Sequence, residues 1–118
     1  ILVEGYIAQS YPTGALNYLT ERDFSGNLFN TYGWGGYIDW TMPQIKVFVD
    51  GRTDLFGDEI LSDYLTFLYA QSNWQAIPDQ WDFHWVLVEP EAPLVDQLRA
   101  AGWRTVYQDP VSVLLTRE

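Results

Sequence analysis

The residues at positions 50–58 form the part of the chain most able to do chemistry. Asp50, Arg52, Asp54 and Asp58 fall within nine residues, directly after the apolar run at 45–49. An arginine guanidinium binds phosphates, carboxylates or sugar hydroxyls, and aspartates beside it either orient it or ligate a hard cation. The same residue types are common in turns, where Arg52 would pair with the aspartates and Asp50 would accept backbone hydrogen bonds. The structural interpretation is the simpler one, and the binding interpretation stays open beside it.

Alternating strand and helix patterns must position this segment. β-Branched and aromatic runs predict strands at 27–31, 45–49, 85–88, 104–108 and 111–116. Helices are expected to begin at Pro12, Asp58 and Pro93. This alternation is typical of a mostly parallel sheet covered on both faces, and Asp109-Pro110 is a tight turn between the last two strands. The sequence therefore predicts a single α/β, Rossmann-like three-layer domain at 11–118, with a mostly parallel sheet and a C-terminal antiparallel hairpin. Residues 1–10 are expected to be a tether or a short strand.

Apolar residues at helical spacing predict which helix faces are buried. In the helix after Asp58, the expected buried stripe is Ile60, Leu61, Tyr64, Leu65 and Leu68. In the helix after Pro93, the residues expected to face inward are Leu94, Val95, Leu98 and Ala101, and Gly102 is expected to end that helix.

Polar residues follow three of the predicted strands at the point where each strand ends. In open α/β sheets, ligands bind outside the carboxyl ends of the parallel strands. If these strands are parallel neighbours, their polar ends meet in one crevice. The predicted binding residues are Asn30, Tyr32, Asp50, Arg52, Asp54, Asp58 and Glu89.

Composition argues against several classes of function. With 6 basic and 16 acidic residues, the formal charge is −10, so the surface repels phosphate backbones and we expect no nucleic-acid partner. The absence of cysteine removes thiolate nucleophiles and cysteine-based zinc sites. We expect no cofactor and no bound metal. Apolar runs are no longer than strands, so no segment of this sequence is expected to span a bilayer. The start at Ile1 rather than Met predicts a piece of a longer protein.

Familiar catalytic and cofactor motifs are incomplete. The glycines in Gly33-Trp34-Gly35-Gly36 lack the spacing of a dinucleotide-binding fingerprint. The stretch Val47-Phe48-Val49-Asp50 is superficially similar to the start of haloacid-dehalogenase phosphatases, but Arg52 stands where those enzymes carry a second acid. His84, the only histidine, begins an apolar strand and is expected to be a core or edge residue. No Gly-x-Ser-x-Gly nucleophile elbow accompanies it.

The six tryptophans are many for a chain of 118 residues. They are Trp34, Trp40, Trp74, Trp81, Trp85 and Trp103. Most are expected in the core, and exposed ones would suit a membrane interface or stacking against sugar rings.

Several strings in the chain resemble a domain of prokaryotic polytopic membrane proteins. They are Tyr11-Pro12, the segment from Gly26 to Tyr37, the segment from Lys46 to Gly57, Trp85 to Val88, and Trp103 to Tyr107. The likeness extends over roughly residues 11–116. The membrane proteins concerned resemble lipid-linked-sugar glycosyltransferases of the dolichyl-phosphate-mannose–protein mannosyltransferase type, in which many transmembrane helices precede a domain like this one.

The resemblance implies a C-terminal domain on the extracytoplasmic side of a membrane. The catalytic carboxylates of such transferases belong to the membrane portion, so no catalytic residue is carried over. The residues that match the domain's own pattern are Asn30, Gly35, Gly36, Asp50, Gly51, Arg52, Asp54 and Gly57. The implied partners are the transmembrane portion of the same chain and a glycan or lipid-linked sugar.

Three functional hypotheses remain. The first is a non-catalytic accessory domain that positions an acceptor or packs over the membrane active site. The second is a sugar- or anion-binding module that uses the crevice at 50–58. The third, and weakest, is an independent hydrolase acting through Asp50 and Asp54, with or without a divalent metal.

Overall fold

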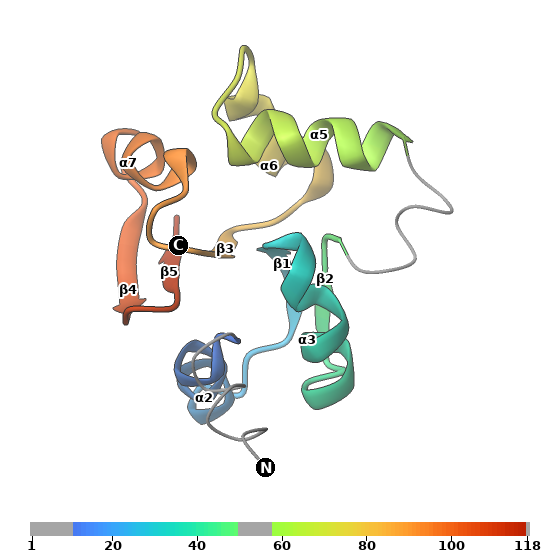
Figure 1. Ribbon diagram of the computed structural model, residues 1–118, viewed down its shortest axis with the longest axis vertical. Helices are drawn as coiled ribbons and strands as arrows, with labels where there is room; N and C mark the ends of the chain where they lie inside the picture. The colour runs from blue at the N-terminus through green and yellow to red at the C-terminus, as the bar shows by residue number, and fades with distance from the viewer. Residues whose placement is uncertain (1–10, 50–57, 118) are drawn as a thin grey trace.

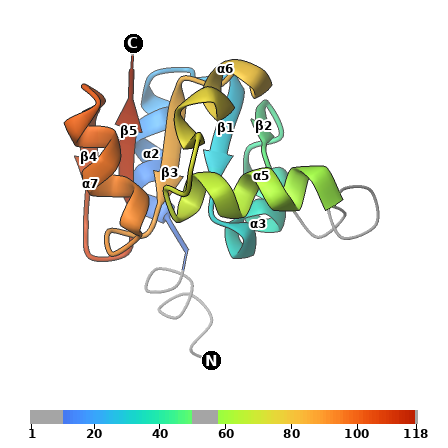
Figure 2. The ribbon, with the colours of Figure 1, turned by 90° about the horizontal axis from the view of Figure 1, so that it is seen from above.

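The protein is built around a five-stranded mixed sheet. The computed structural model describes residues 11–49 and 58–117. The strand order is β2 (Ile45–Val47), β1 (Gly26–Asn30), β3 (Trp85–Val88), β5 (Val113–Thr116) and β4 (Arg104–Gln108). β1 runs parallel to both of its neighbours, whereas β5 runs antiparallel to both of its own. Figure 2 looks onto this sheet from one face.

The prediction of a Rossmann-like domain with a mostly parallel sheet is wrong. The last two strands do pair antiparallel, but β5 lies inside the sheet between β3 and β4. Its residues Val113 to Thr116 are buried throughout, whereas β4 is largely exposed. A strand that is apolar on both faces is stabilised most where neighbours cover both of its edges. Because only a tight turn joins β4 to β5, β5 must run antiparallel to β4, and it pairs antiparallel with β3 as well.

Helices cover both faces of the sheet, as Figure 1 shows. One face carries α2 (Thr13–Glu21), the 3-10 turn Tyr32–Trp34 and α3 (Gly35–Thr41). The other face carries α5 (Asp58–Leu68), the 3-10 turn Trp74–Ala76, α6 (Ile77–Trp81) and α7 (Pro93–Ala100). Alternate strand residues enter the two apolar layers, because side chains alternate across a strand. Phe29, Val86 and Leu115 pack with α5 and α7, while Leu28, Leu87 and Leu114 pack with α2 and α3.

The buried face of α5 differs from the predicted stripe. Leu65 is 50% exposed, whereas Phe67 is fully buried. The ring of Phe67 meets the ring of Phe29 edge to face, with 4.7 Å between centroids, so this contact turns the helix toward Phe67 and away from Leu65. Of the remaining predicted residues, Tyr64 is buried, and Ile60, Leu61 and Leu68 are half-buried. In α7, Leu94, Val95 and Leu98 are buried as predicted, but Ala101 lies beyond the helix end and is exposed.

Four helices end in the same hydrogen-bonded motif. After each helix, one residue adopts a positive φ: Asp23 after α2, Ala70 after α5, Asp82 after α6 and Gly102 after α7. The next N–H donates to the carbonyl five residues back, in the pairs Phe24–Leu19, Gln71–Thr66, Phe83–Pro78 and Trp103–Leu98. This Schellman arrangement satisfies carbonyls that the helix end leaves unpaired. It also sets the direction in which the chain leaves the helix, which places Phe24 and Asp82 beside the starts of β1 and β3.

Candidate functional site

Asn30, a predicted binding residue, is fully buried at the carboxyl end of β1. Its Nδ2 donates to the carbonyl oxygens of Val49, at 2.9 Å, and Thr31, at 3.0 Å. Its Oδ1 accepts from the backbone N–H groups of Phe48, at 2.8 Å, and Val49, at 3.2 Å. These bonds hold the chain after β2 against β1, so Asn30 acts as a clamp between strands and its polar atoms are already engaged.

Two other predicted residues, Tyr32 and Glu89, come together around Tyr64 of α5. The backbone N–H of Tyr32 donates to Tyr64 Oη at 2.9 Å, and their rings meet edge to face at 6.4 Å. Burial raises the pKa of Tyr64; the Tyr32 N–H lowers it, and the nearby charge of Glu89 raises it again, so the net shift is upward. Tyr64 was expected only as a core residue, because its helical spacing gives no indication of the polar contact.

The rest of the predicted crevice is described only in part. Asp50, Arg52 and Asp54 lie outside the described residues. Asp58 begins α5 and is exposed. Glu89 borders a hollow of about 200 Å³ that also includes Tyr69 and Glu91. The structure therefore brings Tyr32 and Glu89 to the carboxyl end of the strands, and it commits Asn30 to a structural role.

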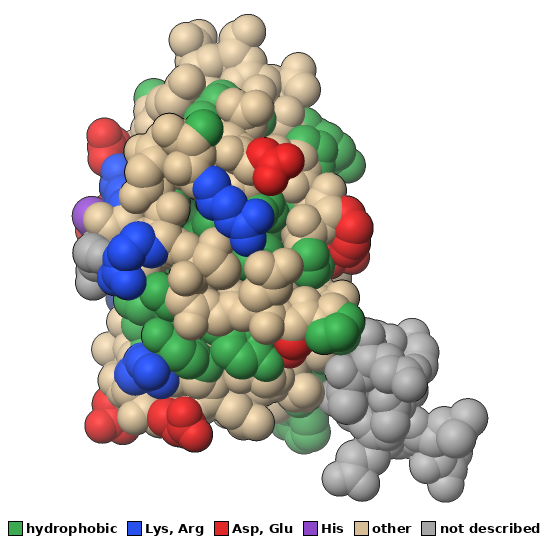
Figure 3. Space-filling model, turned by 90° about the vertical axis from the view of Figure 1, so that its left-hand side faces the viewer, with side chains coloured by type: hydrophobic (Ala, Val, Ile, Leu, Met, Phe, Trp, Pro, Cys, Tyr) green, Lys and Arg blue, Asp and Glu red, His purple; other side chains and the backbone are tan. Residues whose placement is uncertain are grey.

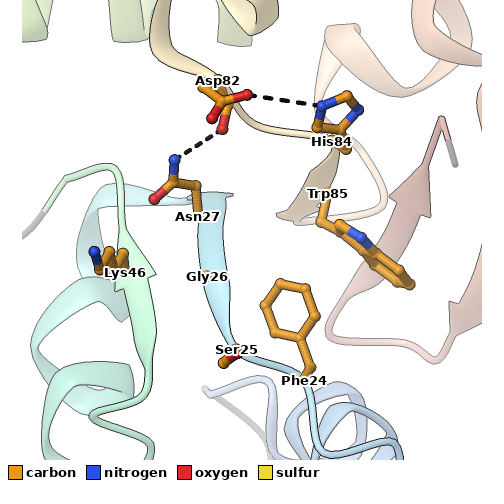
Figure 4. Close-up of a pocket in the computed structure, with 8 residues that line it drawn as sticks. All are labelled: Phe24, Ser25, Gly26, Asn27, Lys46, Asp82, His84 and Trp85. Atoms are coloured by element: carbon orange, nitrogen blue, oxygen red, sulfur yellow. Dashed lines mark hydrogen bonds and ion pairs between the residues drawn. The ribbon is translucent and has the colours of Figure 1, made fainter.

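A larger pocket, of about 390 Å³, lies at the opposite end of the sheet, where β1 and β3 separate. The pairing of β1 with β2 begins at Gly26 and Ile45, but the pairing of β1 with β3 begins only at Phe29 and Val86. Over Gly26–Leu28, β1 therefore pairs with β2 alone, and the pocket occupies the fork between the strands. We call it the fork pocket. It is lined by Phe24, Ser25, Gly26, Asn27, Lys46, Asp82, His84 and Trp85 (Figure 4).

A hydrogen-bonded group of polar residues forms one wall of the fork pocket. Asn27 Nδ2 donates to the main-chain carbonyl of Asp82 at 2.8 Å, which ties β1 to the turn after α6. The Asp82 carboxylate lies 3.8 Å from Nε2 of His84. Arg117 Nε donates to His84 Nδ1 at 3.1 Å, so Nδ1 is an acceptor and the neutral ring carries its proton on Nε2, facing Asp82. Arg117 is itself held by Asp79, at 2.9 Å.

Two aromatic rings form another side of the fork pocket. Phe24 follows the end of α2, and Trp85 begins β3; their ring centroids are 5.3 Å apart and the planes are inclined by 57°. Both rings are half-buried. Figure 4 shows them together on one side of β1, with Lys46 of β2 across the strand from them. The pocket thus combines an apolar surface with carboxylate, amide, imidazole and ammonium groups.

Basic side chains also gather on the face presented by β4 and α7, although the protein is acidic overall (Figure 3). These arginines have structural contacts. Arg99 of α7 donates to Thr105 Oγ1, at 3.0 Å, and to Gln108 Oε1, at 3.2 Å, which covers the edge strand β4. At the end of α2, Arg22 stacks over the Tyr18 ring at 3.5 Å. We therefore do not place a ligand site on this face.

Sequence reasoning did not identify the fork pocket. His84 was expected at an edge or in the core, and its side chain is 44% exposed in the pocket wall. Phe24, Asn27, Lys46 and Asp82 carry no motif, and only the register of β1 against β3 brings them together. Within 11–49 and 58–117, no cluster of three potential metal-ligating acids or histidines is present.

Comparison of the chain with protein-family models, with curated proteins and with solved structures finds no match. Over the described ranges, every helix is too short or too polar to cross a bilayer. The resemblance to a domain of membrane glycosyltransferases therefore stays a prediction.

Proposed function

We propose that this domain binds a glycan in the fork pocket and acts as an accessory domain of a membrane glycosyltransferase-like protein. The observation that carries the proposal is the pairing of the Phe24 and Trp85 rings with the Asn27, Asp82 and His84 group in one open pocket. In this proposal, the membrane portion of the protein carries out the sugar transfer. The domain's role would be to hold an acceptor sugar near that active site.

The chemistry of a sugar ring matches the two sides of the pocket. One face of a pyranose presents C–H groups, which pack on aromatic rings because that contact removes apolar surface from water. Its hydroxyl groups both donate and accept hydrogen bonds. The Asp82 carboxylate accepts, and the His84 Nε2–H donates. The carbonyl oxygen of the Asn27 amide accepts, because its Nδ2 already donates to Asp82.

The pocket is also organised before a ligand arrives. Asn27 fixes the turn at Asp82, and Arg117 fixes the orientation of the His84 ring. A binding group that is already held loses less conformational entropy when the ligand binds. The support for a membrane partner comes from the sequence resemblance at 11–116, and the support for glycan binding comes from the pocket.

The indole N–H signals of the tryptophans allow a direct test by NMR. Methyl glycosides of glucose, mannose, galactose and N-acetylglucosamine are titrated into the labelled domain. We expect at least one of these glycosides to shift the Trp85 indole signal. The signal of Trp40, which is 80% exposed and not among the pocket residues, should stay unchanged.

Replacing one polar group of the wall tests the site itself. Asp82→Asn keeps the shape of the side chain, and asparagine tolerates the positive φ at this position. It removes a charged acceptor, so glycoside affinity is expected to fall about tenfold. Asp96→Asn, on the exposed surface of α7, is the matched control and should bind like the wild type. If none of the four glycosides moves Trp85, glycan binding at the fork pocket is refuted.

A further inference from the structure

Arg117, the residue after β5, is tied by its side chain to α6 and to the residues before β3. Its Nη1 lies 2.9 Å from Asp79 Oδ1, and its Nη2 donates to the Phe83 carbonyl at 3.1 Å. Its Nε donates to His84 Nδ1, also at 3.1 Å. The side chain is 25% exposed, and Arg117 is not among the residues that line the fork pocket. Any effect of Arg117 on the pocket must therefore pass through the residues that it holds, and of these His84 lies in the pocket wall.

The bond between Arg117 and His84 requires a neutral imidazole. A guanidinium N–H can only donate, and Nδ1 can accept only while it carries no proton. An imidazolium carries a proton on each nitrogen, so in that state two N–H groups and two positive charges would face each other. Histidine side chains change charge between about pH 5 and pH 8. Uptake of a second proton therefore breaks this contact and releases the ring from Arg117.

The charged groups around His84 determine where the released ring goes. Within the described residues, Asp82 lies in the turn after α6, Asp79 of α6 is engaged by Arg117, and Lys46 of β2 lines the same pocket. The other side chains that line the pocket are uncharged. Asp82 Oδ1 already lies 3.8 Å from Nε2, so a small rotation brings the imidazolium and the carboxylate into a direct ion pair (Figure 4). Lys46 is cationic and repels the ring, so the released ring turns toward Asp82.

We infer that Arg117 is a positioning residue and that its bond to His84 makes the fork pocket sensitive to pH. While the ring is neutral, Arg117 directs its Nε2–H into the pocket wall, and the Asp82 carboxylate accepts from the ligand. Once the ring is protonated, the two side chains pair with each other, and an uncharged ligand such as a sugar loses both a donor and an acceptor. The pocket thus binds at neutral pH and releases its ligand in an acidic environment. This pH sensitivity regulates the site of the proposed function, and it rests on that proposal for the identity of the ligand.

The first measurement needs no ligand. His84 is the only histidine in the chain, so its two ring nitrogen signals can be followed by NMR in the labelled domain without ambiguity. At about pH 8 we expect a proton on Nε2 alone, and at about pH 5 a proton on both nitrogens. The Arg117 Nε–H signal should move with the same midpoint. The Nε–H of Arg99 is the control, because it donates to the Thr105 hydroxyl, which does not titrate in this range, and its signal should stay unchanged.

The second measurement follows the affinity of the methyl glycoside that shifts Trp85 most. Its affinity should be about tenfold lower at pH 5 than at pH 8, because a hydrogen bond to a charged group is lost. Arg117→Met removes the donor that fixes the His84 tautomer. Its ring signals at pH 8 should show a mixture of the two neutral tautomers, and its glycoside affinity there should be lower, so that the fall toward pH 5 is smaller. Arg99→Met removes the same charge from α7 and should keep the tautomer and the pH profile of the wild type.

The outcomes separate pH regulation by Arg117 from glycan binding. Regulation is refuted if His84 stays neutral at pH 5, if its proton is on Nδ1 at pH 8, or if the Arg117 signal does not follow its titration. It is also refuted if Arg117→Met keeps a pure Nε2–H tautomer, and the wild-type titration decides even if this variant fails to fold. If both signals move together but glycoside affinity is the same at both pH values, regulation is refuted and glycan binding stands. If both signals move together and no glycoside shifts Trp85, the proton-dependent change of the wall stands and the sugar is refuted.

Discussion

Removing the Asn30 side chain should strongly destabilise the fold. In Asn30→Ala, Phe48 N–H keeps its bond to the Leu28 carbonyl, but Val49 loses the bonds that Asn30 makes to both its N–H and its carbonyl. Each buried group left without a partner costs about 1–3 kcal/mol, so the free energy of unfolding should fall by about 2–6 kcal/mol. Domains of this kind are stable by only about 5–15 kcal/mol, so the variant would be marginal.

Urea denaturation followed by tryptophan fluorescence measures this loss. Asn27→Ala is the control, because Asn27 is exposed and, within the described residues, its side chain makes one hydrogen bond, to the Asp82 carbonyl. We expect a loss of less than about 1 kcal/mol. If Asn30→Ala loses no more than the control, the clamp is not important for stability, and Asn30 returns as a candidate ligand-binding residue.

Asn30→Asp tests the same clamp with no loss of volume. The carboxylate still accepts from Phe48 and Val49, but it cannot donate to the carbonyl oxygens of Val49 and Thr31. Burial raises the pKa of such an aspartate in the folded state. The pKa of the aspartate introduced at position 30 is then higher in the folded state than in the unfolded state, where it is about 3.9. The variant is therefore most stable below the unfolded pKa, and it loses stability as the pH rises through the folded pKa. The difference in stability from the wild type should therefore shrink as the pH is lowered, and a difference independent of pH would contradict this reasoning.

Three further changes have expected outcomes. In Gly14→Ala, the new β-carbon would clash with the Tyr107 hydroxyl and lie 2.7 Å from Asp109 Oδ2. The free energy of unfolding, measured by urea denaturation, should therefore fall by about 1–3 kcal/mol. Gly36→Ala is the control, because a β-carbon there meets nothing within 4 Å, and it should not destabilise the fold. Ala70→Gly should stabilise by up to about 1 kcal/mol, because alanine is strained at the positive φ after α5; the helical control Ala100→Gly should destabilise by about as much. The hydrogen bond to Asp109 raises the pKa of Tyr107 to about 12, so stability that is intact below pH 10 should be lost as pH rises through about 12. Tyr107→Phe should remove that alkaline loss, and an unchanged pH profile would contradict the assignment.

Local structure was predictable from the sequence where a single residue type or the periodicity of apolar residues determines it. The strand at Trp85–Val88 and the buried residues Leu94, Val95 and Leu98 of α7 follow from apolar patterns alone. Gly102 ends α7 as expected, since glycine adopts a positive φ without strain. The equivalent ends at Ala70 and Asp82 were not predicted, because neither residue type marks such a position, and tertiary packing determines it.

Sheet order was not predictable, because it depends on long-range pairing. The strands around β5 show the difficulty: a short apolar run fits either an edge hairpin or an internal strand, and only the contact with β3 decides between them. The prediction of a binding crevice depended on that order, since the rule about carboxyl ends applies to parallel sheets. At that end, Asn30 is engaged by four hydrogen bonds, and the segment 50–54 lies outside the described residues.

The fork pocket is a consequence of the elements that stabilise the fold. The pairing of β1 changes partner along its length, from β2 at Gly26–Leu28 to β3 at Phe29–Asn30, and this change opens the space between the strands. The terminating motifs of α2 and α6 then deliver Phe24 and Asp82 to its walls. Stabilising those helix ends with glycine would therefore affect the two ends differently. Asp23→Gly should change stability alone, because Asp23 does not line the pocket. Asp82→Gly would also remove a polar wall group, so it should weaken the glycan binding that we propose for the pocket.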